Sequence, residues 1–462
     1  MMNFQDTIAA ISTAPGTGAI AVVRLSGPEA FSIARKIFSS GKRGSQNDEI
    51  ELKSNFATHG FIYDRATSEP IDEVVLTPFK APHTYTGEDL VEISCHGAPV
   101  ITAEILAVAL RGGARLARRG EFTQRAFLSG RLDLTQAEAV LDVIQAKTSR
   151  QGRRALSALS GSLGNRIKKV RIDLMEIMAR VVAGLDFPEE IGDAPEPQIA
   201  EVTSASIQTL EELARTARTG RYLREGLRVA IVGRPNAGKS SLLNQLLKFE
   251  RAIVTDVPGT TRDSLEETLD LNGIPVVLVD TAGIRPTDDK VEKIGIERTK
   301  QAIVDCDLVL FVVDLSQGWQ EPEAEILRMI DDKPFLLIGN KIDLHSADEV
   351  DATPLPANCA ARIYISAMTG TSVSQLTGSI ESFVFQDQTM RDGPSLNARQ
   401  AELCLKAVDA LRSVQKTLSA GYPQDCLATD FKGAVDALSE ISGESVSEEI
   451  ITQVFATFCI GK

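Results

Sequence analysis

Apolar residues along the chain follow two different periods, which predict a sheet in some segments and amphipathic helices in others. Short, uninterrupted apolar runs bounded by polar loops predict buried strands. These runs are residues 229–232, 275–279, 335–339 and 363–365. A leucine-rich segment at 242–247 follows the first run at helical spacing. This order predicts an α/β domain with a mostly parallel sheet.

The first 120 residues predict a second, mixed α/β domain. Three apolar runs predict strands at 20–25, 72–76 and 90–93, and residues 99–110 predict a helix. Arg24 and Glu92 stand inside two of these runs. Because side chains alternate across a strand, the pattern alone favours solvent-facing positions for both, over anchors in a ligand pocket.

Helical spacing begins at Thr135. The stretch Thr135-Gln136-Ala137-Glu138 has the pattern of a capping box, which predicts a helix start at Thr135. An apolar stripe at 174–185 predicts a helix that ends at nearby prolines, and residues 198–219 predict another. Helical spacing returns in the last ~75 residues, too few for a comfortable separate core. We therefore expect this tail to pack on the helices at 135–219.

These patterns predict a multidomain α/β plus α fold for the 462 residues. The expected parts are an N-terminal domain (1–120), a first helical part (121–219), an inserted α/β domain (220–383) and a second helical part (384–462). No apolar run approaches the roughly 20 residues of a membrane-spanning helix. The first residues lack the features of a signal peptide. We therefore expect a cytoplasmic protein without a membrane partner.

The net charge of −14 argues against broad, non-specific binding of nucleic acid. Six scattered cysteines and four unclustered histidines indicate a reducing compartment and argue against a zinc site. Positive charge gathers locally, which predicts solvated helix faces or a surface for an anionic partner. The basic residues are Arg111, Arg115, Arg118, Arg119, Arg125, Arg131, Arg150, Arg153, Arg154, Arg166, Lys168, Lys169 and Arg171.

The first apolar run leads into Gly233-x-x-x-x-Gly238-Lys239-Ser240, the phosphate-loop pattern. A strand, a glycine-containing loop and a helix are the context that this motif requires. Glycines let backbone N–H groups surround phosphate oxygens, and the helix N-terminus adds positive charge. Lys239 is expected to reach the β- and γ-phosphates, and the Ser240 hydroxyl to bind Mg²⁺.

Two further motifs follow later strands. Asp280-Thr281-Ala282-Gly283 begins with an acid that can orient Mg²⁺ through water. In Asn340-Lys341-Ile342-Asp343, the Asp343 carboxylate can accept hydrogen bonds from guanine N1–H and N2–H₂. Adenine lacks the N2 donor, so this motif disfavours an ATPase. Ser366 and Ala367 supply another base-side loop, and the order of the motifs predicts a GTP-hydrolysing domain.

More motifs occur with these: Gly259-Thr-Thr-Arg-Asp263, Tyr85-Thr-Gly-Glu-Asp89, Gly120-Glu-Phe-Thr-Gln-Arg-Ala-Phe127 and Cys459-Ile-Gly-Lys462. With them, the chain resembles the tRNA uridine-modification GTPases called MnmE or TrmE. The resemblance implies an N-terminal domain that binds tetrahydrofolate and dimerises, a helical-bundle domain, and an inserted Ras-like P-loop GTPase domain.

The resemblance also implies partners and a reaction. The family works with a flavin-dependent partner, MnmG (GidA). Together they add an aminomethyl or carboxymethylaminomethyl group to C5 of the wobble uridine of tRNA, and 5-formyl- or methylene-tetrahydrofolate supplies the one-carbon unit. The alternative left by the GTPase motifs alone is a regulatory GTPase switch in ribosome or RNA assembly, which has no reason to bind folate.

The resemblance further implies how GTP is hydrolysed. Ile284 stands where Ras-like switches carry a water-orienting glutamine, and the family's water-orienting acid maps to Glu292. Thr261 matches the threonine that joins Ser240 on Mg²⁺. K⁺ would be held by the Asn236 side chain and nearby carbonyls, where it offsets phosphate charge as an arginine finger does. The carbonyls belong to Thr255, Val257 and Thr260.

Residues of both sites follow from this resemblance. Arg24, Glu92 and Lys462 match folate contacts, which reverses the solvent-facing expectation. Arg131 stands where the family usually has lysine, a change that a tight site does not treat as equivalent. Cys459 matches a family cysteine whose role, nucleophilic or structural, stays open. The expected GTP contacts are Asn236, Ala237, Gly238, Lys239, Ser240, Ser241, Thr255, Asp256, Val257, Pro258, Gly259, Thr260, Thr261, Asp280, Thr281, Ala282, Gly283, Asn340, Lys341, Asp343, Ser366, Ala367 and Met368.

Overall fold

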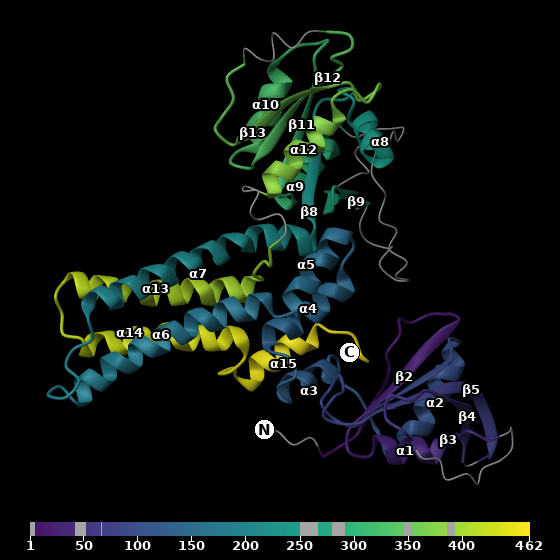
Figure 1. Ribbon diagram of the computed structural model, residues 1–462. Helices are drawn as coiled ribbons and strands as arrows, with labels where there is room; N and C mark the ends of the chain where they lie inside the picture. The colour runs from purple at the N-terminus through teal and green to yellow at the C-terminus, as the bar shows by residue number, and fades with distance from the viewer. Residues whose placement is uncertain are drawn as a thin grey trace. The chain divides into compact units, whose positions relative to one another are not determined.

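The computed structural model of the chain forms two compact units (Figure 1). It describes residues 5–41, 52–65, 67–249, 267–279, 292–345, 353–385 and 393–462. The first unit comprises Met1–Leu141, Gly164–Ile172 and Val435–Lys462, and the second comprises Asp142–Leu163 and Asp173–Ala434. Three helices run through both units: α4 (Leu134–Gln145), α6 (Ser162–Asp186) and α14 (Asp425–Ser442).

The first unit is built on a seven-stranded sheet in the order β3-β4-β5-β6-β2-β1-β7. Neighbouring strands are antiparallel except β1 and β7, which are parallel. The strands expected near 20, 72 and 90 are confirmed as β2, β5 and β6. The pattern did not predict the other four. The strands are β1 (Ile8–Ile11), β2 (Ile20–Ser26), β3 (Phe38–Ser39), β4 (Thr58–Asp64), β5 (Glu69–Phe79), β6 (Leu90–His96) and β7 (Arg115–Leu116).

The two faces of this sheet have different partners. Helices α1 (Ala30–Ile37) and α2 (Pro99–Arg111) bury their apolar sides on one face, which confirms the helix expected at 99–110. Val23 and Leu25 of β2 belong to this core. Because neighbouring residues of a strand point to opposite faces, Arg24 lies on the other face of the sheet.

The helix start expected at Thr135 is wrong by one position, because a neighbouring carboxylate caps the helix. Helix α4 begins at Leu134. The Gln136 N–H donates to Asp133 Oδ1 at 2.8 Å, and the Asp133 N–H donates back to Gln136 Oε1 at 3.0 Å. The Thr135 hydroxyl donates to the same oxygen, Asp133 Oδ1, at 2.6 Å, so Asp133 rather than Thr135 caps the helix. Asp and Thr are both good N-caps, so the pattern alone did not separate them.

A buried ion cluster holds α3 (Glu121–Leu128) to the first sheet. The Arg125 side chain is 1% exposed and pairs with Asp6 at 2.8 Å, Glu121 at 3.0 Å and Glu88 at 3.2 Å. Arg115 also pairs with Glu121, at 2.6 Å. Burial alone would raise the pKa of Glu121, but its hydrogen bonds to these guanidinium groups hold that pKa below the ordinary value.

The segment around Gly461 joins the same unit, after helix α15 (Glu448–Ala456). The Phe122 N–H donates to the Lys462 carbonyl at 3.2 Å, and the Ser12 hydroxyl donates to the Gly461 carbonyl at 3.0 Å. Gly461 has φ +95°, and a Cβ there would overlap the Ile11 carbonyl oxygen. Only glycine fits this close approach of two backbones.

The second unit contains a six-stranded sheet in the order β13-β12-β11-β8-β10-β9. Its neighbours are parallel except β9 and β10, which confirms the mostly parallel sheet. The four expected strands are confirmed, whereas β9 and β11 were not predicted. The elements are β8 (Leu227–Val232), α8 (Lys239–Phe249), β9 (Glu267–Leu271), β10 (Ile274–Val279), α9 (Glu292–Asp305), β11 (Leu308–Asp314), α10 (Glu321–Ile330), β12 (Phe335–Asn340), β13 (Cys359–Ile365) and α12 (Val373–Val384).

Long helices complete the second unit: α5 (Ser149–Leu159), α7 (Glu196–Glu225) and α13 (Ala398–Ser419). Helix α13 runs beside α7 (Figure 1). Arg412 pairs with Glu211 at 2.7 Å, and the Leu396 N–H donates to the Thr216 hydroxyl at 3.2 Å. The expected packing of the tail on the earlier helices is thus confirmed for α13. The four domain boundaries stay a prediction.

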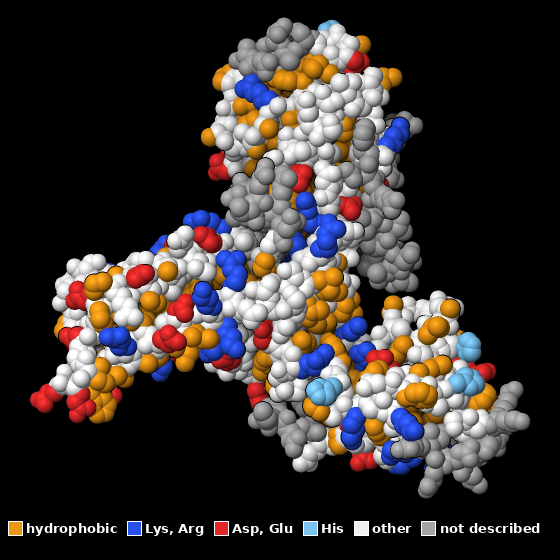
Figure 2. All heavy atoms as spheres, viewed as in Figure 1, with side chains coloured by type: hydrophobic (Ala, Val, Ile, Leu, Met, Phe, Trp, Pro, Cys, Tyr) orange, Lys and Arg blue, Asp and Glu red, His pale blue; other side chains and the backbone are white. Residues whose placement is uncertain are grey.

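Several arginines of the basic run make ion pairs. Arg111 pairs with Asp64 at 2.7 Å, and Arg171 pairs with Glu444 at 2.5 Å. Figure 2 shows Lys and Arg mixed with Asp and Glu along the long helices of the second unit. The ion pairs fit the interpretation of solvated and paired helix faces.

Three of the six cysteines are buried as small apolar groups: Cys95, Cys306 and Cys404. Burial raises the pKa of the Cys95 and Cys306 thiols to about 11, and that of Cys404 to about 12. These thiols are therefore protonated at neutral pH. Among the helices that the structure describes, none has both the length and the apolar character needed to cross a lipid bilayer.

We predict that Glu121→Gln destabilises the chain by about 3 kcal/mol at pH 7, because one partner of a buried pair is lost. The pKa of Glu121 is depressed in the folded state, so its contribution is present above the ordinary value of 4.5 and is lost as the pH falls below it. Urea unfolding at several pH values measures the difference.

Glu73→Gln is the control for this prediction. Its pair with His59 at 2.6 Å is more than half exposed on both sides, so we expect a loss of about 0.5 kcal/mol or less. Equal losses in the two variants would contradict a stabilising role for the buried cluster.

Candidate functional site

A tight loop joins β8 to α8 at the carboxyl edge of the second sheet. Gly233 and Gly238 have φ +152° and +98°, values that L side chains rarely adopt. A Cβ on Gly233 would overlap the Val312 carbonyl, and one on Gly238 would overlap the Asn340 amide. The loop therefore turns directly onto the N-terminus of α8, where backbone N–H groups favour an anion.

The Lys239 ammonium lies across this loop. It donates to the carbonyl oxygens of Gly233 at 2.8 Å and Arg234 at 2.7 Å, and burial lowers its pKa. Asn236 has φ +64° and is exposed near the turn of the loop. Ser240 follows Lys239 in the first turn of α8 and is half-buried. A lysine, a hydroxyl and an amide oxygen thus surround one loop.

A single buried amide connects the phosphate loop to the base-side loop. The Asn340 side chain is at the end of β12, and the residue is 3% exposed. Its Nδ2 donates to the Ala237 carbonyl at 2.8 Å, and its Oδ1 accepts from the Ala367 N–H at 2.9 Å. Asn340 therefore fixes the spacing between the two loops.

Lys341, the next residue, is held by an acid that the sequence did not single out. Its Nζ lies 2.6 Å from Asp314 Oδ2, at the end of β11. Burial would raise the pKa of Asp314, but hydrogen bonds from Lys341 and Ser316 lower it. The uninterrupted apolar run at 308–313 was the signal that could have placed Asp314 at this edge.

The described part of the predicted GTP set gathers at this edge of the sheet. Asp343 and Met368 are exposed there, and Ser366 is buried and accepts from the Thr369 N–H at 3.2 Å. Glu292 begins α9, but its side chain lies outside the described residues. Other predicted contacts also lie outside them: Thr255, Asp256, Val257, Pro258, Gly259, Thr260, Thr261, Asp280, Thr281, Ala282 and Gly283.

A second cluster lies on the face of the first sheet that α1 and α2 leave open. Arg24 and Glu92 face each other across β2 and β6, and Arg24 Nη2 lies 2.7 Å from Glu92 Oε1. The Arg24 guanidinium lies over the rings of Tyr85 and Phe122, 5.5 and 5.6 Å from their centroids. The solvent-facing expectation from the pattern is wrong for Arg24, whose side chain is 14% exposed.

Lys462 and Arg131 act electrostatically on the same cluster. The pKa of the half-buried Lys462 is lowered by burial and then by the charge of Arg24, and Glu92 opposes this shift. Burial raises the pKa of Tyr85, against the positive charges of Arg24 and Arg131. All four residues of the predicted folate set thus belong to the first unit, where Arg24 and Glu92 are in direct contact.

Two aromatic residues of this cluster had no role in the sequence analysis. Tyr85 and Phe122 lie on separate parts of the chain, so only the fold reveals that both rings lie beside one guanidinium. Cys459 is exposed and follows helix α15 near the end of the first unit. The structure leaves both of its expected roles open.

Two family models match the chain almost end to end. The model described as GTP-binding protein TrmE N-terminus matches residues 7–131. The model described as MnmE helical domain matches residues 134–459, well over half of the chain. The chain belongs to the MnmE family.

Full-length relatives in this family are named tRNA modification GTPase MnmE. One from Thermoanaerobacter pseudethanolicus is 43% identical over 461 residues, 99% of both chains. One from Streptococcus pneumoniae is 44% identical over 462 residues, again 99% of both. One from Moorella thermoacetica is 44% identical over 465 residues, 99% of this chain and 100% of the relative. Membership in the MnmE family makes this chain a GTP-hydrolysing enzyme of tRNA modification.

Two solved structures of GTP-binding proteins resemble a part of this MnmE-family chain. A variant of Aquifex aeolicus Era bound to GDP and AlF4⁻ is 27% identical, covers 40% of this chain and 66% of its own, and has a TM-score of 0.27. Elongation factor SelB from Methanococcus maripaludis with a GTP analogue is 22% identical, covers 35% of this chain and 34% of its own, and has a TM-score of 0.27.

We predict that Asn340→Ala weakens GDP and GTP binding at least about tenfold, because two loops lose their common partner and buried groups stay unpaired. Titration with fluorescent nucleotide measures the effect. Asn358→Ala is the matched control, since its amide donates to the Asp331 and Lys333 carbonyls, both at 2.7 Å, before the start of β13. Nucleotide binding unchanged in Asn340→Ala would contradict the bridging role.

Proposed function

We propose that this MnmE-family chain uses GTP hydrolysis and a reduced folate to help modify C5 of the wobble uridine of tRNA. The group added is an aminomethyl or carboxymethylaminomethyl group, and a flavin-dependent partner of the MnmG (GidA) type takes part. The observation that supports the proposal best is the convergence of Arg24, Glu92 and Lys462 on the open face of the first sheet. Family membership favours this function over a switch in ribosome assembly.

The folate site is proposed from the chemistry of the cluster. The Glu92 carboxylate can accept hydrogen bonds from the amidine-like N–H groups of a pterin. Lys462 and Arg131 add positive charge, which suits the carboxylates of a folate. The rings of Tyr85 and Phe122 lie beside the Arg24 guanidinium and help to hold it next to Glu92. The residues present therefore fit 5-formyl- or methylene-tetrahydrofolate.

The GTP site is proposed from the loops at the edge of the second sheet. Lys239 would exchange its two carbonyl partners for the β- and γ-phosphates, a change favoured by the charge of the triphosphate. Asp343 would accept from the guanine N1–H and N2–H₂ groups. Asn340 would hold the two loops at the spacing that one nucleotide needs.

The donor types in the loop also fit two cations. A hydroxyl and an amide oxygen are ligands that hard cations prefer. Ser240 and Thr261 would bind Mg²⁺, whereas the Asn236 side chain and the carbonyls of Thr255, Val257 and Thr260 would bind K⁺. When bound, these cations would offset negative charge on the phosphates. Glu292 would orient the attacking water.

The partners are proposed on the same basis. The N-terminal domain is proposed to form a homodimer, and the flavoprotein partner to contribute much of the tRNA binding, since this chain is acidic overall. The reaction is proposed to take place in the cytoplasm, which suits the use of GTP, folate and tRNA.

We predict that the purified chain binds 5-formyltetrahydrofolate in calorimetry, and that Glu92→Gln weakens binding at least about tenfold because charge-assisted hydrogen bonds are lost. Glu73→Gln, an exposed carboxylate on the neighbouring strand β5, is the control and keeps the parent affinity. Absence of folate binding by the parent chain would refute the folate part of the proposal and leave the GTPase part intact.

We predict that K⁺ raises kcat for GTP at least about tenfold over Na⁺ at equal ionic strength, because a fixed charge stabilises the transition state. Asn236→Gly should remove most of this difference. Glycine adopts the φ of +64° without strain, so the variant removes the amide and keeps the loop. Equal rates in the two salts would count against K⁺ as a cofactor.

A further inference from the structure

The first turn of α5 is hydrogen-bonded to the turn between β9 and β10. The Thr148 hydroxyl donates to the Gly273 carbonyl at 2.8 Å, and Arg150 Nη1 donates to the Asn272 carbonyl at 3.1 Å. Gly273 has φ +86°, and a Cβ on it would lie 2.8 Å from the Arg150 Cβ. The helix therefore approaches this turn as closely as glycine permits.

Arg150 also contacts a second part of the α/β segment, which runs from β8 to α12. Its guanidinium pairs with Glu381 of α12 at 3.3 Å, and both side chains are less than one-fifth exposed. The same group lies 4.8 Å from the centre of the Phe385 ring, just after α12. Arg150 therefore joins α5 to the β9–β10 hairpin and to α12, the last helix of this segment.

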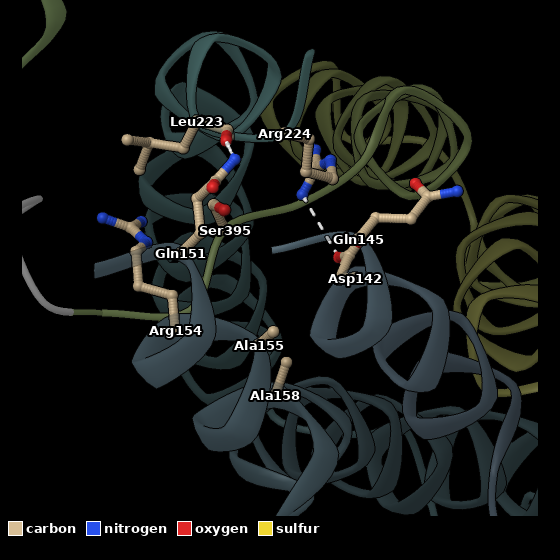
Figure 3. A pocket seen from close by; sticks show the side chains of 10 residues that line it. Asp142, Gln145, Gln151, Arg154, Ala155, Ala158, Leu223, Arg224 and Ser395 are labelled. Atoms are coloured by element: carbon tan, nitrogen blue, oxygen red, sulfur yellow. Dashed lines mark hydrogen bonds and ion pairs between the residues drawn. The ribbon is translucent and has the colours of Figure 1, made fainter. Parts of the chain in front are cut away.

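The network continues from this turn into α7. Thr148 and Gln151 form the capping box of α5, and the Gln151 N–H donates to the Thr148 hydroxyl at 3.2 Å. The Gln151 amide donates to the Leu223 carbonyl near the end of α7, as Figure 3 shows. A small cavity separates the two helices beside this bond, and Arg224 and Asp142 lie 3.9 Å apart across it. Hydrogen bonds thus link the turn to α5, and α5 to α7.

The position of the hairpin in the chain makes this contact informative. Strand β10 ends at Val279, immediately before Asp280 of the Asp-x-x-Gly motif, and β9 follows the motif that contains Thr261. Among the strands that the structure describes, β9 is at the edge of the sheet and pairs only with β10. The turn held by α5 is therefore the far end of both strands that adjoin the nucleotide motifs. A change at either motif can reach the turn along one of these strands.

We propose that the first turn of α5 couples the nucleotide state of the GTPase segment to the helices of the second unit. Thr148 and Arg150 act as positioning residues, since they hold the β9–β10 turn and contact no nucleotide-binding residue named above. This coupling needs only GTP binding and hydrolysis, so it is independent of the folate and K⁺ proposals. The physical requirement is that the two nucleotide states favour different positions of one bistable element.

Hydrogen exchange of the full chain tests this coupling, with GDP compared with a non-hydrolysable GTP analogue in Mg²⁺ and K⁺. In the parent chain, exchange across residues 148–159 should differ at least about fivefold between the two nucleotides, the lower end of typical couplings. Arg150→Met alters the helix side of this contact and Gly273→Ala alters the turn side. In both variants the difference in exchange between the two nucleotides should fall below about twofold. The KM for GTP should stay close to the parent value.

Two further variants separate coupling from simple stability. Arg153→Met removes an exposed arginine from the same helix and should keep the parent difference. Arg150→Lys retains a donor and a positive charge, so it should keep part of the difference in exchange between the two nucleotides. The proposal is overturned if α5 exchanges alike in both nucleotides in the parent chain, or if Arg150→Met retains the full difference.

Discussion

The burial of one guanidinium organises the first unit. A charged group that is 1% exposed is tolerated only when opposite charges and hydrogen-bond acceptors surround it. Arg125 meets this condition with Asp6, Glu88 and Glu121, which come from three separate stretches of the chain. The requirement fixes α3 against the sheet, and α3 supplies the Phe122 ring beneath Arg24. The candidate folate cluster therefore depends on a second charge cluster, which holds α3 in place.

The second unit uses a neutral group in a comparable way. Asn340 satisfies a carbonyl of the phosphate loop and an N–H of the base-side loop with one amide. A buried amide without either partner would be costly, so the two loops adopt the only spacing that satisfies both. In both units a buried polar side chain sets the geometry of residues that are themselves accessible to a ligand.

Contiguous features were predictable from the sequence. Parallel strands covered on both faces are uninterrupted apolar runs, which is why 229–232 and 335–339 were identified as strands. The phosphate loop was predictable because its residues are consecutive. By contrast, β3 and β7 have two residues each, too few to show a period of hydrophobic and polar positions. The cap at Asp133, just before the helix start at Leu134, was missed because Asp and Thr are both competent caps.

Features that depend on pairing between distant strands were not predictable. Arg24 and Glu92 are 68 residues apart, and only the register of β2 and β6 puts them opposite each other. The alternation of side chains indicated that they share a face, but not that aromatic residues cover it. The expected roles of these residues, of Lys462 and of the K⁺ ligands came from the family resemblance, because no spacing in the chain encodes them.

The bond between Ser12 and Gly461 joins residues 449 positions apart. During vectorial synthesis on the ribosome, the edge beside β1 forms hundreds of residues before the segment that docks there exists. The Ser12 hydroxyl and the Phe122 N–H therefore form their bonds to this segment only after the whole GTPase segment has emerged. Closure of so long a loop is slow relative to local folding, which makes docking of this segment a late step of maturation.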